Sequence, residues 1–363
     1  MNQAFRLPPY PYDRLDASRA TADKLPGGCV DLSTGTPTDP APPAVIDALA
    51  TSQREVAYPA SIGTLALREA AAGWLERRFG VHVDRSQIAA CVGTKELVAG
   101  MPQWLRLRAP DRDTVLYPET SYPTYAMGAV LAGCRAVPYR RFEDIASEDA
   151  DRALCLWVNS PANPTGALVD LHAAAAWGRS HGVLVLSDEC YIEFTWEGPG
   201  RSILSAGTDG VLALHSLSKR SNLAGLRAGF YAGDEDLVGF LSELRKHAGF
   251  MVPGPVQEAA IVALWDDEHV EAQRDRYHKR LRRMMDVLGA AGVECSMPAG
   301  TFYLWGRVLG DGDAWRMTTE LARRGGALVA PGDLYGQAGA GHIRVAVVQP
   351  DDRLDLVADR LLA

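Results

Sequence analysis

The chain has 363 residues, of which 47% are hydrophobic and 23% charged, and its formal net charge is -8. This composition is typical of a soluble globular protein that is long enough for two or three structural lobes. The acidic balance argues against a nucleic-acid-binding protein, and no segment approaches the ~20 apolar residues of a membrane span. The N-terminal sequence MNQAFRLPPYPYDRL lacks the pattern of a signal peptide, so we expect a cytoplasmic protein.

The six cysteines are scattered without a Cys-x-x-Cys pair, and the eight histidines show no ligand-like spacing. Most of the cysteines stand in apolar runs such as IAACVG and ALCLWV, where we expect ordinary core residues. Neither a disulfide scaffold nor a zinc knuckle is therefore expected, and we predict no metal site.

Proline and glycine are frequent in residues 1–43, which we expect to form an extended arm. From Ala44 the pattern becomes helical, and TLALREAAAGWLERRFG repeats apolar residues at three and four before it ends at Gly80. Farther along, apolar runs alternate with helical stretches. Continuous apolar runs in this alternation predict the strands of a mostly parallel sheet with helices on both faces. The candidate strands are 88–93, 114–119, 153–160, 182–189 and 211–218.

The pattern changes near residue 250, where a long and partly charged helical segment begins. This segment, 255–292, is compatible with one long helix or with two helices and a break. AGTFYLWGRV and GHIRVAVVQP then indicate strands of a smaller sheet. We therefore predict a large domain over 44–250 and a small C-terminal domain over 251–363. We expect the arm 1–43 to join the small domain.

Polar residues follow each of the apolar runs at the point where the strand ends. In open parallel sheets, ligands bind outside the carboxyl ends of the strands, so we expect these residues to converge. Thr94 and Lys95 start a helix after one strand and offer backbone donors to a phosphate, although such a start is alone more often only a helix beginning. Arg227 and the hydroxyls of Ser216 and Ser218 are further phosphate ligands.

A carboxylate and a lysine accompany these phosphate ligands. Asp188 ends the run LVLSD and is costly to bury without a cationic partner, such as a protonated ring nitrogen. Lys219 follows the apolar run VLALH, and burial of its amine lowers the pKa enough for the free base to exist near neutrality. A phosphate site, a carboxylate for a pyridinium and a lysine together describe pyridoxal phosphate held as a Schiff base.

Nearly the whole chain resembles the class I/II (fold type I) pyridoxal-phosphate aminotransferases. The motifs that carry the resemblance are NSPANPTG, SDECY, HSLSKRSNLAGLRAGF and RKHAGFMVPGPVQ, in this order. They are most similar to the motifs of N-succinyldiaminopimelate aminotransferases of actinobacterial type. The resemblance implies a large domain with a mostly parallel seven-stranded sheet flanked by helices, and a smaller α/β C-terminal domain.

The resemblance also implies roles for single residues. Lys219 is expected to form the imine with pyridoxal 5'-phosphate and to carry the proton between the substrate Cα and the cofactor. Asp188 is expected to pair with the pyridine nitrogen, and Asn163 and Tyr191 to donate hydrogen bonds to the phenolic oxygen. Tyr122 is expected to stack on the ring.

Further residues match the phosphate and substrate positions of the family. Arg344 in HIRVAVV matches the arginine that binds the substrate α-carboxylate, with Gly35 and Asn163 beside the substrate. Tyr58 matches the tyrosine that reaches the phosphate in the neighbouring subunit, which implies a homodimer with shared active sites. The residues expected around the phosphate in the same subunit are Thr94, Lys95, Ser216, Ser218 and Arg227.

The resemblance implies transamination by a ping-pong aldimine/ketimine mechanism, in which glutamate gives its amino group to a keto acid. N-succinyl-2-amino-6-oxopimelate, of lysine and diaminopimelate biosynthesis, is the expected acceptor. Alternatives on the same fold are a secondary-metabolic enzyme that catalyses amino-acid cyclisation, elimination or replacement, and a non-catalytic protein that binds the cofactor. Lys246 and His247 remain open between a distal substrate carboxylate and a solvated turn, and Tyr125 is expected to pack structurally.

Overall fold

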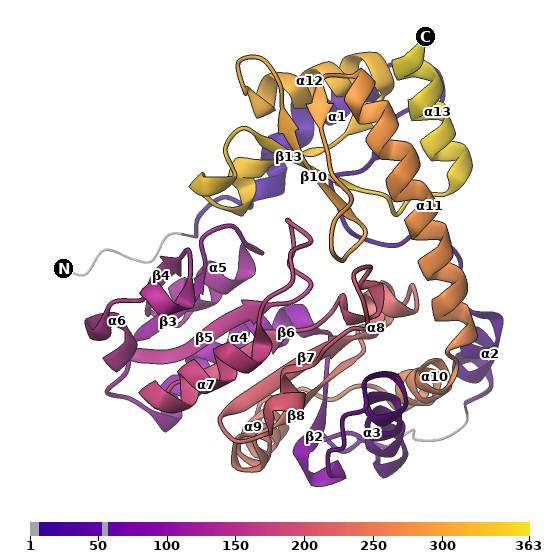
Figure 1. The fold of residues 1–363 in the computed structure, drawn as a ribbon. Helices are drawn as coiled ribbons and strands as arrows, with labels where there is room; N and C mark the ends of the chain where they lie inside the picture. The colour runs from indigo at the N-terminus through magenta and orange to yellow at the C-terminus, as the bar shows by residue number, and fades with distance from the viewer. Residues whose placement is uncertain (1–6, 53–56) are drawn as a thin grey trace.

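The structure is a computed structural model that describes residues 7–52 and 57–363. A large and a small sheet, each with its own helices and hydrophobic core, form the two halves of the molecule (Figure 1). The long helix α11 (Glu268–Ala290) reaches from one half to the other. No helix in the described part of the chain combines the length and apolarity that a membrane span requires.

The large sheet has seven strands in the order β2-β8-β7-β6-β5-β3-β4, and all are parallel except β8, which is antiparallel to both neighbours. This confirms the predicted mostly parallel seven-stranded sheet. The strands are β2 (Ile88–Cys91), β3 (Thr114–Pro118), β4 (Arg135–Tyr139), β5 (Ala153–Asn159), β6 (Leu184–Asp188), β7 (Val211–Ser216) and β8 (Gly229–Gly233).

Helices cover both faces of this sheet, because its central strands are apolar on both sides. Along β5, Cys155 and Trp157 pack toward one layer of helices, and Leu156 and Val158 pack toward the other. The first layer contains α4 (Thr94–Arg108), α5 (Thr124–Leu131) and α9 (Glu235–Ala248). The second contains α3 (Leu65–Phe79), α7 (Leu171–His181) and α10 (Gly254–Trp265). The other helices of this half are α2 (Pro43–Thr51), α6 (Ser147–Asp151) and α8 (Leu217–Arg220).

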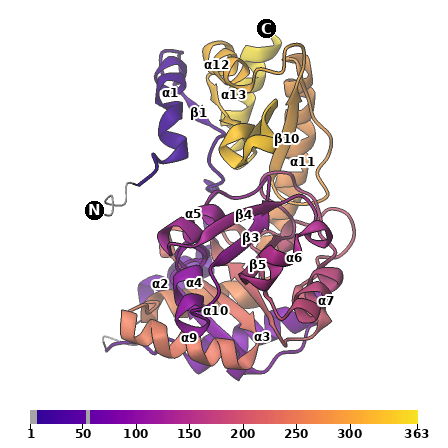
Figure 2. The same cartoon turned by 90° about the vertical axis from the view of Figure 1, so that its left-hand side faces the viewer.

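The small sheet is antiparallel, in the order β12-β13-β10-β9, and packs against α11 and two later helices. The N-terminal arm runs up one side of the molecule to this half (Figure 2), where β1 (Val30–Asp31) pairs with β11 (Ala327–Leu328). The other elements are β9 (Val293–Glu294), β10 (Tyr303–Val308), β12 (Ala330–Pro331), β13 (His342–Ala346), α12 (Ala314–Gly325) and α13 (Asp351–Leu362).

Two local expectations change. The arm is not extended throughout, because α1 (Asp16–Ala22) forms in the segment DASRATA and packs against α12. The segment 255–292 is two helices, and the break between α10 and α11 falls at Asp266 and Asp267. Since α10 packs in the core of the large sheet, we propose that the chain passes to the small domain at this break. The domain bounds 1–43, 44–250 and 251–363 otherwise remain a proposal.

A buried ion pair ties the arm to α11, and we predict that it stabilises the fold. Arg280 donates to both carboxylate oxygens of Asp39 at 2.6 and 2.9 Å, and the side chains are only 5% and 8% exposed. Arg280→Met leaves the Asp39 carboxylate buried without its cation, which should lower the free energy of unfolding by about 3 kcal/mol. Denaturant titration of the purified protein measures this loss.

The matched control is Arg283→Met on the same helix, because Arg283 and its partner Asp355 are both 45% exposed. The control should change the free energy of unfolding by less than about 1 kcal/mol. Burial alone would raise the pKa of Asp39, but the hydrogen bonds from Arg280 lower it. The difference between wild type and Arg280→Met should therefore shrink as the pH falls below about 4. Equal losses in the two variants would contradict the prediction.

Candidate active site

A cavity of about 480 Å³ lies where the carboxyl ends of β5, β6 and β7 face the small sheet and the arm. Its volume is within the range of small-molecule sites. It lies at the carboxyl edge of the parallel strands, as the sequence predicts. Among the described residues, no group of three or more His, Cys, Asp or Glu side chains is placed to hold a metal ion.

Lys219 enters this cavity from the short helix α8, directly after β7. The hydroxyl of Ser216 caps the helix and accepts a hydrogen bond from the Ser218 N–H at 3.2 Å. The Nζ atom of Lys219 donates to the carbonyl of Gly35, which the arm places at 2.5 Å. Burial lowers the pKa of Lys219 to about 8. About a tenth of the amine is therefore unprotonated and nucleophilic at pH 7, far more than for an ordinary lysine with a pKa of about 10.4.

Asp188 ends β6 beside Lys219 and is only 6% exposed. One carboxylate oxygen accepts from the Tyr125 hydroxyl at 2.9 Å, and the other accepts from the Cys190 N–H at 3.2 Å. Burial raises its pKa, although these hydrogen bonds lower it in part. Within residues 7–52 and 57–363, Asp188 forms no ion pair. A buried carboxylate in this state favours a cationic ligand group.

Arg344 of β13 supplies the cation on the small-domain side and is 2% exposed. It donates to the Asn163 side-chain oxygen at 2.8 Å and to the Ser33 carbonyl, while its Nε atom has no hydrogen-bond partner in the described part of the chain. The guanidinium lies 4.1 Å from the centre of the Tyr303 ring, whose hydroxyl is 2.9 Å from that of Tyr191. These contacts hold the planar guanidinium of Arg344 in place, and its shape suits a carboxylate.

The opposite end of the cavity suits an anion. Gly93 precedes α4 with a φ of 76°, and a Cβ there would lie 2.2 Å from a terminal nitrogen of Arg227. Only glycine lets the guanidinium approach the start of α4 this closely. Among the residues that the structure describes, Arg227 makes one hydrogen bond, to the Ala224 carbonyl at 2.8 Å, which leaves further donors for a ligand. The helix N-terminus and the guanidinium together form a phosphate-sized anion site.

Every site residue predicted from the sequence lines this cavity except Tyr58. Tyr58 is 95% exposed on the surface of the large half. Lys246 and His247 do not line the cavity, and Lys246 lies 3.5 Å from Glu243 at the end of α9. The cavity brings together Gly35, Thr94, Lys95, Tyr122, Asn163, Asp188, Tyr191, Ser216, Ser218, Lys219, Arg227 and Arg344.

Comparison with known proteins gives the family. The family model described as aminotransferase class I and II matches residues 28–361. The chain belongs to this family. It is 43% identical to the 4-dedimethylamino-4-oxo-anhydrotetracycline transaminase OxyQ of Streptomyces rimosus, over 98% of this chain and 99% of the relative. It is 32% identical to the LL-diaminopimelate aminotransferase of Aquifex aeolicus, over 98% of this chain and 96% of the relative.

Among solved structures, the chain is similar to a probable N-succinyldiaminopimelate aminotransferase from Thermus thermophilus. The TM-score is 0.86 at 31% identity, over 96% of this chain and 98% of the other. The fold is therefore that of the fold type I aminotransferases, and the chain is a transaminase whose cofactor is pyridoxal 5'-phosphate.

The residues present fit this cofactor. The unpaired buried carboxylate of Asp188 suits a protonated pyridine nitrogen, and the anion site at Gly93 and Arg227 suits the phosphate. Lys219 lies in the same cavity, and a buried amine of this kind is chemically suited to react with an aldehyde carbon. The chain thus offers a suitable group for the ring nitrogen, the phosphate and the aldehyde of the cofactor. The role of each single residue remains a proposal.

Some cavity residues were not predicted from the sequence. Tyr10 and Tyr12 reach the cavity from the arm, and Tyr303 reaches it from β10. The tyrosines in PPYPYDR were the only available signal, because aromatic residues are unusual in a solvated arm. Tyr125 does pack as expected, stacked on Trp157, but its hydroxyl also orients Asp188.

We predict that Lys219 of the cofactor-free aminotransferase reacts with amine reagents at lower pH than an ordinary lysine. Because burial lowers its pKa to about 8, the amine is protonated and unreactive below that pH and becomes reactive above it. Labelling at this residue, followed by peptide mass spectrometry, should have its midpoint near pH 8. Nα-acetyllysine, with an ordinary pKa of about 10.4, is the reference compound. A midpoint close to that of the reference would contradict the prediction.

Proposed function

We propose that this aminotransferase moves the amino group of glutamate to N-succinyl-2-amino-6-oxopimelate by a ping-pong mechanism. The observation that carries the proposal is Arg344, a buried guanidinium that lines the same cavity as Lys219. This arrangement fits an α-amino acid held by its carboxylate with its Cα near the lysine. Two of the similar proteins reported above have a diaminopimelate skeleton in their names, which supports the acceptor.

When bound, pyridoxal phosphate supplies the electron sink that lets an amino group leave one substrate and enter another. In our proposal, the Lys219 amine would hold the cofactor and would move the proton at the substrate Cα. The near-neutral pKa of its amine suits this exchange of a proton in both directions. Asp188 keeps the ring nitrogen protonated, and Tyr125 and the Cys190 N–H hold that carboxylate in place.

The remaining residues orient the reacting groups. Arg344 binds the α-carboxylate beside Gly35, and Asn163 accepts from Arg344, which leaves its amide N–H donors for the phenolic oxygen. Tyr191 would also donate to that oxygen, and the Tyr122 ring would cover one face of the cofactor ring. The residues proposed for the phosphate are Thr94, Lys95, Ser216, Ser218 and Arg227.

We also propose that the protein is a homodimer whose subunits share their active sites. We propose that it is located in the cytoplasm. The exposed ring of Tyr58 supports it, because a tyrosine that is 95% exposed in one subunit is free to reach the phosphate of a neighbour. Residues 53–56 before it lie outside the described residues.

A second candidate function is transamination of a ketone in secondary metabolism. The observation that favours it is the 43% identity to OxyQ, whose name gives a tetracycline intermediate as its substrate. Aromatic Tyr10 and Tyr12 line the cavity and would suit a flat acceptor. Cyclisation, elimination or replacement reactions remain further alternatives, and they differ from transamination in leaving the cofactor in its aldehyde form.

A single-turnover experiment tests the reaction. Glutamate added to the cofactor-loaded protein should convert the visible absorption of the aldehyde form to that of the amine form, with release of 2-oxoglutarate. N-succinyl-2-amino-6-oxopimelate should then restore the original spectrum, because Arg344 also binds the α-carboxylate of an acceptor. Lys219→Ala is the control and should lose turnover while remaining folded. Conversion by glutamate without recovery by this acceptor would favour the ketone of secondary metabolism.

Arg344→Lys tests the carboxylate contact. A lysine keeps the positive charge but cannot make two parallel hydrogen bonds, so kcat/KM for glutamate should fall by about 100-fold. Arg307→Lys is the matched control, because Arg307 stands on the neighbouring strand β10, is 58% exposed and pairs with Glu294. It should retain wild-type kcat/KM. Equal kcat/KM in wild type and Arg344→Lys would contradict the assignment.

A further inference from the structure

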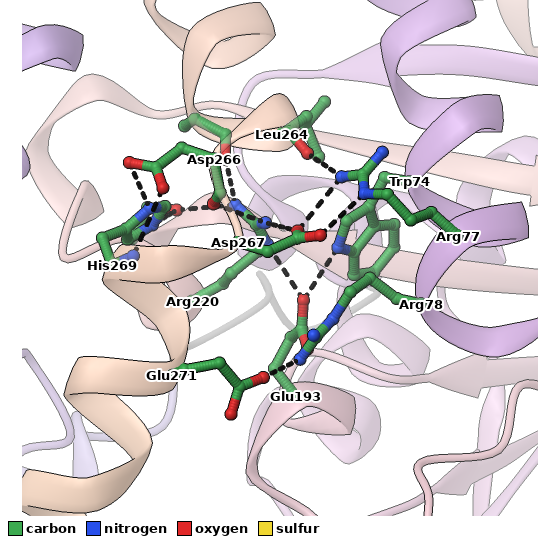
Figure 3. Close-up of polar contacts among 12 residues, drawn as sticks. Trp74, Arg77, Arg78, Glu193, Arg220, Leu264, Asp266, Asp267, His269 and Glu271 are labelled. Carbon is green, nitrogen blue, oxygen red and sulfur yellow. Dashed lines mark hydrogen bonds and ion pairs between the residues drawn. The ribbon is translucent and has the colours of Figure 1, made fainter.

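Arg220, the residue after Lys219, does not line the active-site cavity. It is buried and belongs to a cluster of polar side chains (Figure 3). The guanidinium is 3% exposed, and each of its nitrogens is bonded. Its Nε donates to Glu193 at 3.1 Å, and one terminal nitrogen donates to the Ala263 carbonyl and to Ser221. The other lies 3.3 Å from the Asp266 carbonyl and 3.4 Å from the Asp267 carboxylate.

Glu193 is the central acceptor of this cluster and is also 3% exposed. It lies in the short 3-10 helix η4 (Ile192–Phe194), two residues after Tyr191. One carboxylate oxygen accepts from Arg220 and, at 2.8 Å, from the Trp74 ring nitrogen. The other accepts twice from Arg78, at 2.9 and 3.1 Å. The carboxylate is therefore fully hydrogen-bonded, which is the condition under which a buried charge is tolerated.

The Arg220–Glu193 pair connects the two segments that carry cofactor residues. Lys219 stands in α8, which has four residues and follows β7, and Tyr191 stands in the loop that follows β6. A helix this short cannot be stable through its own hydrogen bonds, so tertiary contacts must set its position. The pair is a buried ion pair that joins α8 to η4 directly.

Arg220 is placed to act on Lys219 through position rather than through charge. Burial lowers the pKa of Lys219 to about 8, and the nearby charges that modify it belong to cavity residues such as Arg344, Arg227 and Asp188. Arg220 has its own counter-charges in Glu193 and Asp267. A change of geometry at Arg220 should therefore move the Lys219 nitrogen without changing its titration.

We propose that Arg220 and Glu193 are positioning residues of this aminotransferase, whose buried ion pair fixes Lys219 and Tyr191 relative to each other. The proposal rests on the proposed role of Lys219 and goes beyond it. A reacting atom must lie within well under about 1 Å of its productive position. Because Arg220 is the residue next to Lys219, a shift of Arg220 should have a large effect on the rate.

Arg220→Lys tests the proposal, because it keeps the charge and loses the fork that contacts several groups at once. The cofactor-free variant is mixed with pyridoxal phosphate, and attachment to Lys219 is followed by visible absorption and by mass spectrometry after borohydride reduction. We expect attachment and kcat each to be at least about tenfold slower than in wild type. The pH midpoint of Lys219 labelling should stay at its wild-type value.

Arg77→Lys is the matched control from the same cluster. Arg77 donates to Asp267 at 2.6 and 3.0 Å and does not contact Glu193 within the described residues. Its variant should lose stability in denaturant titration yet attach the cofactor at the wild-type rate. Equal slowing in Arg77→Lys and Arg220→Lys would overturn the proposal, because general destabilisation would then explain both.

Glu193→Gln gives a second, independent variant if Arg220→Lys does not fold. The amide keeps the size of the side chain and one acceptor oxygen, and it should also slow attachment with an unchanged pH midpoint. A wild-type rate in either folded variant would overturn the proposal. Absence of attachment to Lys219 in the wild-type protein would instead overturn the proposed role of Lys219 itself, so the two failures are distinguishable.

Discussion

The structure depends on one constraint, which is that an amine must be held out of water at the end of a buried strand. Burial disfavours the ammonium form of Lys219, and the fold accommodates the free amine with the Gly35 carbonyl as its acceptor. The parallel register then places the other buried charge nearby, because Asp188 ends the strand next to β7. The chemistry of the cavity therefore follows from where two adjacent strands stop.

Buried charges elsewhere in the chain support this arrangement from outside the cavity. The cluster around Glu193 joins α3, η4, α8 and the start of α11, and its arginines and carboxylates neutralise one another. Farther along α11, Arg280 binds Asp39 of the arm, only a few residues from Gly35. One helix thus contacts both the anchor of the nucleophile and the segment that accepts its hydrogen bond.

The sequence predicts the large sheet and most of the cavity, because apolar runs and the residues after them are local features. Lys219, Asp188 and Asn163 each follow a recognisable strand. Arg220 could not be identified in this way, since an arginine beside a lysine normally indicates a solvated surface and its partner lies 27 residues away. The hydrogen bond from Tyr125 to Asp188 depends on how α5 packs over β6, which no local pattern encodes.

The two walls of the cavity come from different parts of the fold, and in our proposal this separates the residues that hold the cofactor from those that select the substrate. Asp188, Lys219 and Arg227 stand on the large sheet and its loops, within a core that tolerates little change. Tyr10 and Tyr12 come from the arm, where Tyr12 packs on a separate cluster and its hydroxyl lies 2.8 Å from that of Tyr335. The acceptor specificity of this aminotransferase should accordingly depend on the arm and the small sheet.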